Sequence, residues 1–152
     1  MLILPNEWIL DYLTPGTNKS SISEDFVDEC RRREHVLLIR RQGNFRTKLF
    51  RYSKLYPLSR VLGRFVALVL RDFQMVRLIE EGDLTGQECD LSSIPADDRY
   101  LVEVLLSFPS AVLITTDEFL RDQVVALGLR AVLFRDNIAL ALNGAEALCS
   151  PE

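Results

Sequence analysis

The sequence has few of the residues and patterns that mark several protein classes. Its 152 residues include three cysteines, Cys30, Cys89 and Cys149, too few and too widely spaced for a disulfide framework or a zinc knot. Seven glycines and six prolines exclude a collagen-like, low-complexity or disordered chain. The longest unbroken apolar run, Phe65–Leu70, is far too short to cross a bilayer, and the N-terminus lacks the features of a signal peptide. We therefore expect a soluble cytoplasmic protein with no membrane segment, folded as one domain over residues 1–152.

Motifs for nucleotide binding and nucleophilic catalysis are also missing. Neither GxGxxG nor GxxxxGK[ST] occurs, so no nucleotide cofactor is indicated. The single histidine, His35, begins a predicted strand, away from the end where ligands bind, and we interpret it as structural rather than as a general base. No serine or cysteine has a histidine in a triad-like pattern, which argues against a covalent nucleophile.

Positive charge is concentrated in one part of an acidic chain. The basic segment, residues 31–71, contains twelve Lys and Arg and one acidic residue, a charge of +11, so the other residues together carry −15. Such a segment is a candidate surface for binding a polyanion. The alternative is a pair of amphipathic helices whose basic faces are neutralised by the acidic remainder. The residues that we expect to contact a nucleic-acid backbone are Arg40, Arg41, Arg46, Lys48 and Arg51.

Short apolar runs alternate with stretches of helical periodicity. The runs span residues 1–4, 35–39, 75–79, 111–115 and 131–134. Continuous apolar strands separated by helices are typical of a parallel sheet that is covered on both faces. The sequence therefore predicts a three-layer α/β/α fold with a parallel sheet of about five strands.

Acidic and amide side chains recur where these predicted strands end. They are Asn6 and Glu7, Glu80 and Glu81, Asp117 and Glu118, and Asp136, while Asp97 and Asp98 begin the helix before the fourth strand. Ligands of such sheets bind beyond the carboxyl ends of the strands, and carboxylates gathered there suit Mg²⁺ or Mn²⁺. Taken singly, Asp97, Asp98 or Asp117 is equally explained as a helix N-cap, and only their clustering favours a metal site.

Two segments resemble a known family. Residues 112–120, Val-Leu-Ile-Thr-Thr-Asp-Glu-Phe-Leu, precede a predicted helix, Gly128 and a fifth strand. Asp98 stands nineteen residues before Asp117, and residues 2–13 read as an apolar strand followed by a helix that ends in Tyr-Leu. These features are similar to those of PIN-domain nucleases over residues 1–13 and roughly 94–142, whereas the basic segment matches in architecture alone.

The resemblance implies a PIN-like fold whose acidic residues bind Mg²⁺ or Mn²⁺ and hydrolyse RNA. Such proteins are commonly the toxin of a toxin–antitoxin pair, which implies a homodimer and an antitoxin-like protein partner. Carried over to this chain, Asp98 and Asp117 are metal ligands, and Thr115 orients the metal-bound water.

The chain departs from the family at its first acidic motif. The aspartate that should end the first strand aligns with Pro5, which cannot bind a metal, so Asn6 or Glu7 is the nearest substitute ligand. The family's helix-borne glutamate corresponds to Glu29 or to Glu80.

Three hypotheses follow. The first is a metal-dependent ribonuclease with Asp98, Asp117, Thr115 and Glu7 as catalytic residues, and with RNA held by the basic segment. The second is a PIN-like module that binds RNA without a competent metal site. The third is a protein-interaction domain whose basic face meets an acidic partner such as an antitoxin tail.

Overall fold

Each predicted apolar run forms a strand of one sheet. The computed structural model describes residues 1–151, and its strands are β1 (Leu2–Pro5), β2 (Val36–Arg40), β3 (Val76–Ile79), β4 (Val112–Thr115) and β5 (Ala131–Leu133). They pair in the order β3-β2-β1-β4-β5, and every pair is parallel. The predicted parallel sheet is confirmed, with β1 at its centre.

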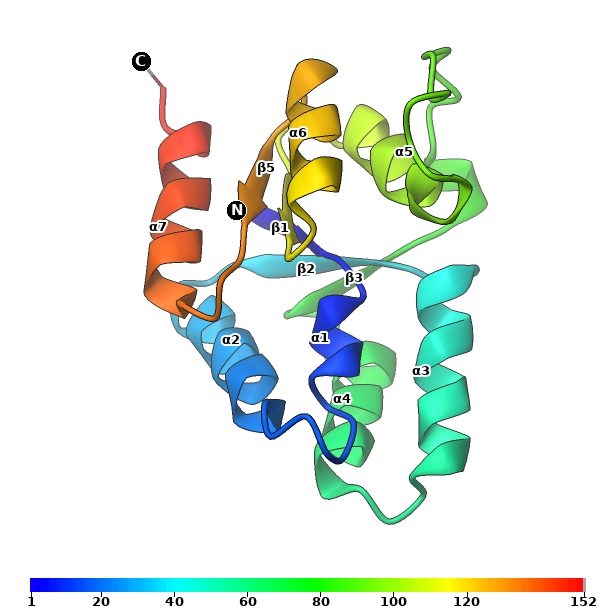
Figure 1. Cartoon of the computed structure of the whole chain (residues 1–152), viewed down its shortest axis with the longest axis vertical. Helices are drawn as coiled ribbons and strands as arrows, with labels where there is room; N and C mark the ends of the chain where they lie inside the picture. The colour runs from blue at the N-terminus through cyan, green and yellow to red at the C-terminus, as the bar shows by residue number, and fades with distance from the viewer. Residues whose placement is uncertain (152) are drawn as a thin grey trace.

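Alternate strand residues point into two apolar layers. Ile3 and Val112 pack with the helices of one face, whereas Leu4 and Leu113 pack with those of the other, because successive side chains leave a strand on opposite sides. The first layer contains α1 (Trp8–Asp11), α2 (Ser20–Arg32), α3 (Asn44–Leu55), α4 (Arg60–Arg71) and α7 (Ile138–Cys149). The second contains α5 (Arg99–Ser107) and α6 (Glu118–Ala126), and the 3₁₀ turns η1 (Glu81–Asp83) and η2 (Ala96–Asp98) precede α5. Figure 1 shows α5 and α6 above β2 and α1 to α4 below it.

An aromatic cluster fixes α1 against the sheet. The Trp8 ring lies 4.3 Å from Phe134, 5.2 Å from Phe26 and 5.4 Å from Tyr12, measured between centroids. Its indole N–H donates a 2.8 Å hydrogen bond to the backbone oxygen of Ile114 in β4. The first helix is therefore tied to β4 as well as to its own strand, which fixes the position of the two residues between β1 and α1.

The helices of the described chain do not include a membrane-spanning one. Over residues 1–151, no helix is both long enough and apolar enough to cross a bilayer.

Candidate functional site

The carboxyl ends of β1 and β4 lie side by side and position the first site residues. Pro5 stands opposite Ile114 in the sheet register, and the backbone N–H of Asn6 donates to the Ile114 oxygen at 3.1 Å. The Asn6 side-chain amide then donates to the Thr115 hydroxyl, also at 3.1 Å. The backbone N–H and the side-chain amide of Asn6 thus both connect the end of β1 to the end of β4.

Thr115 and Asp117 form the next part of the site. The Thr115 side chain is fully buried, and its Oγ1 accepts hydrogen bonds from the Asn6 amide and from the Asp117 backbone N–H. Its own O–H proton is thus left to donate to a neighbouring oxygen. One carboxylate oxygen of Asp117 accepts from the Leu120 N–H at 3.1 Å and caps α6. The structure confirms that Asp117 caps α6, and this cap does not prevent Asp117 from also acting as a metal ligand.

Asp98 joins Asp117 and Glu7 in what we call the acidic cluster. Burial raises the pKa of Asp98, and the nearby carboxylates of Asp117, Glu7 and Asp97 raise it further. Asp98 occupies the N-cap position of α5, but its side chain makes no capping hydrogen bond. Asp98 therefore stands at the predicted N-cap position without capping the helix through its side chain, and its partly buried carboxylate faces like charges.

Glu7 is the member of the acidic cluster with a cationic partner. Its side chain is 18% exposed, and Oε1 lies 3.4 Å from Nζ of Lys48 on α3. The Tyr100 hydroxyl is buried and has no hydrogen-bond partner within residues 1–151. Burial, and then the charges of Glu7 and Asp98, raise the pKa of this phenol. Lys48 on α3 and Tyr100 on α5 therefore both lie near the acidic cluster.

The side chains at this edge of the sheet offer few ligands for a metal ion. Within residues 1–151, no three or more His, Cys, Asp or Glu side chains are grouped so as to hold a metal ion. Pro5 supplies no ligand, and Lys48 already pairs with Glu7. Asp98 and Asp117 remain, and two carboxylates are enough for Mg²⁺, which keeps several waters and also takes oxygens from a phosphate substrate.

The two candidates for the helix-borne glutamate lie in ion pairs elsewhere. Glu29 pairs with Arg32 and Arg33, and hydrogen bonds from these guanidinium groups lower the pKa of Glu29 to about 2. Glu80 pairs with Arg41. Neither is among the charges that raise the pKa of Asp98, so nothing in the structure joins them to the acidic cluster.

The other predicted acids at this edge also have partners. Asp136 accepts a 2.6 Å hydrogen bond from the Tyr12 hydroxyl and pairs with Lys19 at 3.0 Å. Glu81 pairs with Arg40, and Glu118 lies within 3.8 Å of Arg121. These contacts explain the three acids of this paragraph, like Glu29 and Glu80, as parts of surface ion pairs, which contribute little to stability singly.

The five basic residues of the predicted nucleic-acid surface divide into two groups. Arg40, Arg41 and Lys48 pair with acidic side chains, as the neutralised alternative expected. Arg46 and Arg51 are exposed on α3 and lie over the rings of Phe50 and Tyr52, at 5.2 and 5.5 Å from the centroids. These two arginines are therefore available to a phosphate backbone.

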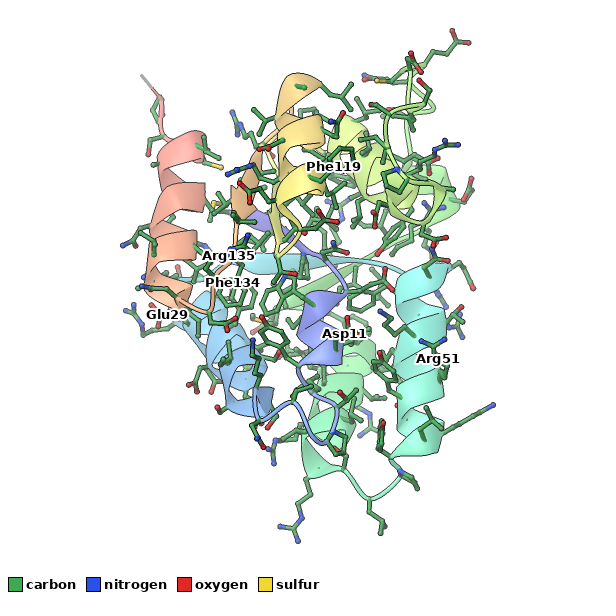
Figure 2. All side chains as sticks on the ribbon, in the orientation of Figure 1. Asp11, Glu29, Arg51, Phe119, Phe134 and Arg135 are labelled. Carbon is green, nitrogen blue, oxygen red and sulfur yellow. The ribbon has the colours of Figure 1, made fainter. Side chains whose placement is uncertain are left out.

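Helix α3 borders the acidic cluster. The Asn44 side-chain amide donates to the Asp97 backbone oxygen at 3.1 Å, which ties the start of α3 to η2. Further along, the Tyr52 hydroxyl donates to Asp11 of α1 at 2.6 Å. Figure 2 labels Asp11 on α1 and Arg51 on the neighbouring α3. Lys48, which we expected to contact RNA, instead faces α1, and the roles of Tyr52 and Tyr100 were not predicted from the sequence.

No family model matches the chain, and no curated protein or solved structure matches it. The sheet order β3-β2-β1-β4-β5 is consistent with a PIN-like architecture. Membership of the PIN-domain family stays a prediction.

The raised pKa of Asp98 predicts a stability effect. Because the folded state disfavours its charged form, Asp98 lowers stability at neutral pH, and this cost disappears as the pH falls below the ordinary pKa of 3.8. Asp98→Asn should therefore melt at a higher temperature than the wild type at neutral pH and lose that advantage at about pH 4. Thermal unfolding followed across this range tests it. Asp122→Asn is the control, because Asp122 is exposed and is not among the charges that raise the pKa of Asp98, and an equal gain in both variants would contradict the prediction.

Proposed function

We propose that the chain is a PIN-like ribonuclease that depends on Mg²⁺ or Mn²⁺. The observation that supports this most is that the charges of Asp117, just after β4, and Glu7, just after β1, add to burial in raising the pKa of Asp98. A basic helix, α3, lies beside this cluster. Negative side chains that attract a divalent cation are thus placed next to positive side chains that attract a phosphate backbone.

In this proposal Asp98 and Asp117 hold the ion. The bound metal would activate a water and neutralise charge on the phosphate. Asp117 is kept in place by its capping hydrogen bond to Leu120 N–H, and Thr115 offers its O–H to orient a nearby oxygen. Arg46 and Arg51 hold the RNA backbone from the exposed side of α3. A homodimer and an acidic antitoxin-like partner belong to the same proposal through the family resemblance.

The experiment that tests this function is an RNA-cleavage assay with the purified chain. Cleavage of a long unstructured RNA should need Mn²⁺ or Mg²⁺, stop in EDTA and return when the metal is added back. Cleavage that is insensitive to EDTA, or no cleavage in either metal, would contradict the proposal.

A second candidate function is binding of RNA without cleavage. Two observations favour it: Pro5 replaces the first acidic ligand, and the Lys48 ammonium already neutralises Glu7. RNA that is retained without cleavage in the presence of Mn²⁺ would support this function over the first.

Either function predicts the same role for the exposed arginines of α3. Arg46→Gln combined with Arg51→Gln should weaken RNA binding and reduce the slope of log affinity against log salt by about two, roughly one for each lost phosphate contact. Filter binding over a range of salt concentrations measures both quantities. Arg40→Gln with Arg41→Gln is the matched control, because these side chains are already paired with Glu81 and Glu80. An equal change of slope in both double variants would contradict the assignment.

A further inference from the structure

A small cavity, which we call the α3–α4 cavity, lies between these two helices at the end opposite their connecting turn (Figure 1). It has a volume of about 310 Å³ and is lined by the first half of α3, the end of α4 and the last residues of β2 and β3. Pockets for small organic ligands measure roughly 300–1,000 Å³, so this one suits a single ring system. It also lies at the carboxyl ends of parallel strands, where the ligands of such sheets bind.

The α3–α4 cavity has a closed apolar floor and an exposed apolar mouth. Phe45, Leu49 and Val69 form the floor and are buried in the core. At the mouth, Leu70 is 48% exposed and Phe73 is 77% exposed. Large apolar side chains left in water around a hollow are typical of a binding surface.

The mouth also carries an exposed cation. Arg46 lines the cavity, and its guanidinium lies 5.2 Å from the ring centroid of Phe50, which lines it too. Arg40 and Arg41 are at the same rim, but both are held by acidic side chains. The mouth therefore combines aromatic rings, on which a flat ring can stack, with a guanidinium that can pair with a phosphate.

We propose that the α3–α4 cavity takes one unpaired base of single-stranded RNA while Arg46 contacts a neighbouring phosphate. A base has a flat face that stacks on aromatic side chains, and its phosphate supplies the negative charge that complements Arg46. The bases of a duplex are stacked and paired inside the helix, so they cannot enter. The cavity therefore selects single strands.

This inference rests on the RNA-binding part of the proposed function and deepens it by naming the class of substrate. It needs neither a metal ion nor cleavage. Because all five strands are parallel, the cavity at the ends of β2 and β3 shares one edge of the sheet with the residues that follow β1 and β4. One RNA strand can thus run along this edge and contact both places.

The first measurement compares two probes in EDTA, which prevents metal-dependent cleavage. The probes are a labelled single-stranded RNA of about ten nucleotides and the same RNA annealed to its complement. Phe73→Ala should bind the single strand about tenfold more weakly than the wild type and bind the duplex equally well, because a stacking contact is lost. The slope of log affinity against log salt should stay the same, since no phosphate contact is removed.

The matched control is Phe119→Ala, which removes an exposed phenylalanine from α6 in the other helical layer and should bind both probes like the wild type. Single-strand binding by Phe73→Ala that equals the wild type overturns the inference, and so does an equal loss for both probes. A change of oligomeric state in Phe73→Ala, followed by sedimentation, also overturns it, because a second copy of the chain would then cover this mouth.

The second measurement locates the base without a substitution. The methyl NMR signals of Leu49 and Val69, on the floor of the cavity, should shift when the single strand is added and stay in place with the duplex. Val124, buried in the other layer, provides the reference signal. Unshifted floor signals at saturating RNA overturn the inference.

These outcomes separate the inference from the proposed function. Weaker binding by the Arg46→Gln and Arg51→Gln double variant, with no effect of Phe73→Ala, overturns the base cavity alone. Binding that depends on Phe73, in a protein that cleaves no RNA in Mn²⁺, supports the cavity and overturns the ribonuclease function. A wild type that binds neither probe overturns both.

Discussion

Asp117→Asn should reduce metal-dependent RNA cleavage on the order of a hundredfold to a thousandfold while leaving the fold intact. A metal ligand that stabilises charge in the transition state is worth several kcal/mol, which corresponds to this range of rates. The structural role of Asp117 should survive the change, because asparagine caps a helix about as well as aspartate does and can still accept from Leu120 N–H. The measurement is the initial cleavage rate under saturating Mn²⁺.

Two further variants separate the role of the charge from the role of the cap. Asp122→Asn makes the same substitution at an exposed position of the same helix and should retain the wild-type rate. Asp117→Ala should lose both the activity and about 1 kcal/mol of stability, since it also removes the cap. Full activity of Asp117→Asn would exclude Asp117 as a metal ligand.

Trp8→Ala should lower the free energy of unfolding by about 3–5 kcal/mol, as expected when a large buried aromatic side chain is truncated. Trp8 is 4% exposed, packs against Phe26 and Phe134, and donates its indole N–H to the Ile114 oxygen. The substitution leaves a cavity between α1 and β4 and removes one of the two hydrogen bonds that the Ile114 oxygen accepts, the other coming from the Asn6 backbone N–H. Chemical denaturation followed by far-UV circular dichroism measures the loss.

The control for this prediction is an exposed aromatic residue. Phe119 is 56% exposed on α6, and Phe119→Ala should change the free energy of unfolding by no more than about 0.5 kcal/mol. A loss below about 1 kcal/mol for Trp8→Ala would mean that α1 is not anchored to β4 through this side chain.

The fold could be predicted from the sequence because its strands have a simple pattern. Runs such as residues 35–39 and 111–115 are largely apolar without alternation, which is characteristic of strands covered on both faces. The structure places β4 within the second run, and β2 covers the first from Val36 and ends one residue beyond it, at Arg40. The ends of the elements were less predictable. Asn44, for example, is a residue type that often caps a helix, but here it is the first residue of α3, and its side chain donates to the Asp97 backbone oxygen.

The candidate site could be predicted only in part. Thr115 is the last residue of β4 and Asp117 stands two residues after it, so their position depends on one strand end, which the sequence pattern located. The pairing of Lys48 with Glu7 depends on how α3 packs against α1, and no periodicity shows which face of a basic helix turns inward. The sequence does contain one signal for it: Glu7 and Asp11, at helical spacing, present two acids to whatever lies beside α1.

The hydrogen bond between Asn6 and Thr115 joins residues that are 109 positions apart, across the central pair of strands β1 and β4. Glu7 lies 91 residues before Asp98 and 110 residues before Asp117. During synthesis, the ribosome must therefore release the chain to beyond Asp117 before the acidic cluster can assemble. A nascent chain shorter than about residue 120 has the basic helix α3 but lacks the β4 end of the cluster. If the proposed ribonuclease activity is correct, the growing chain cannot cut the message from which it is being translated until Asp117 has left the ribosome.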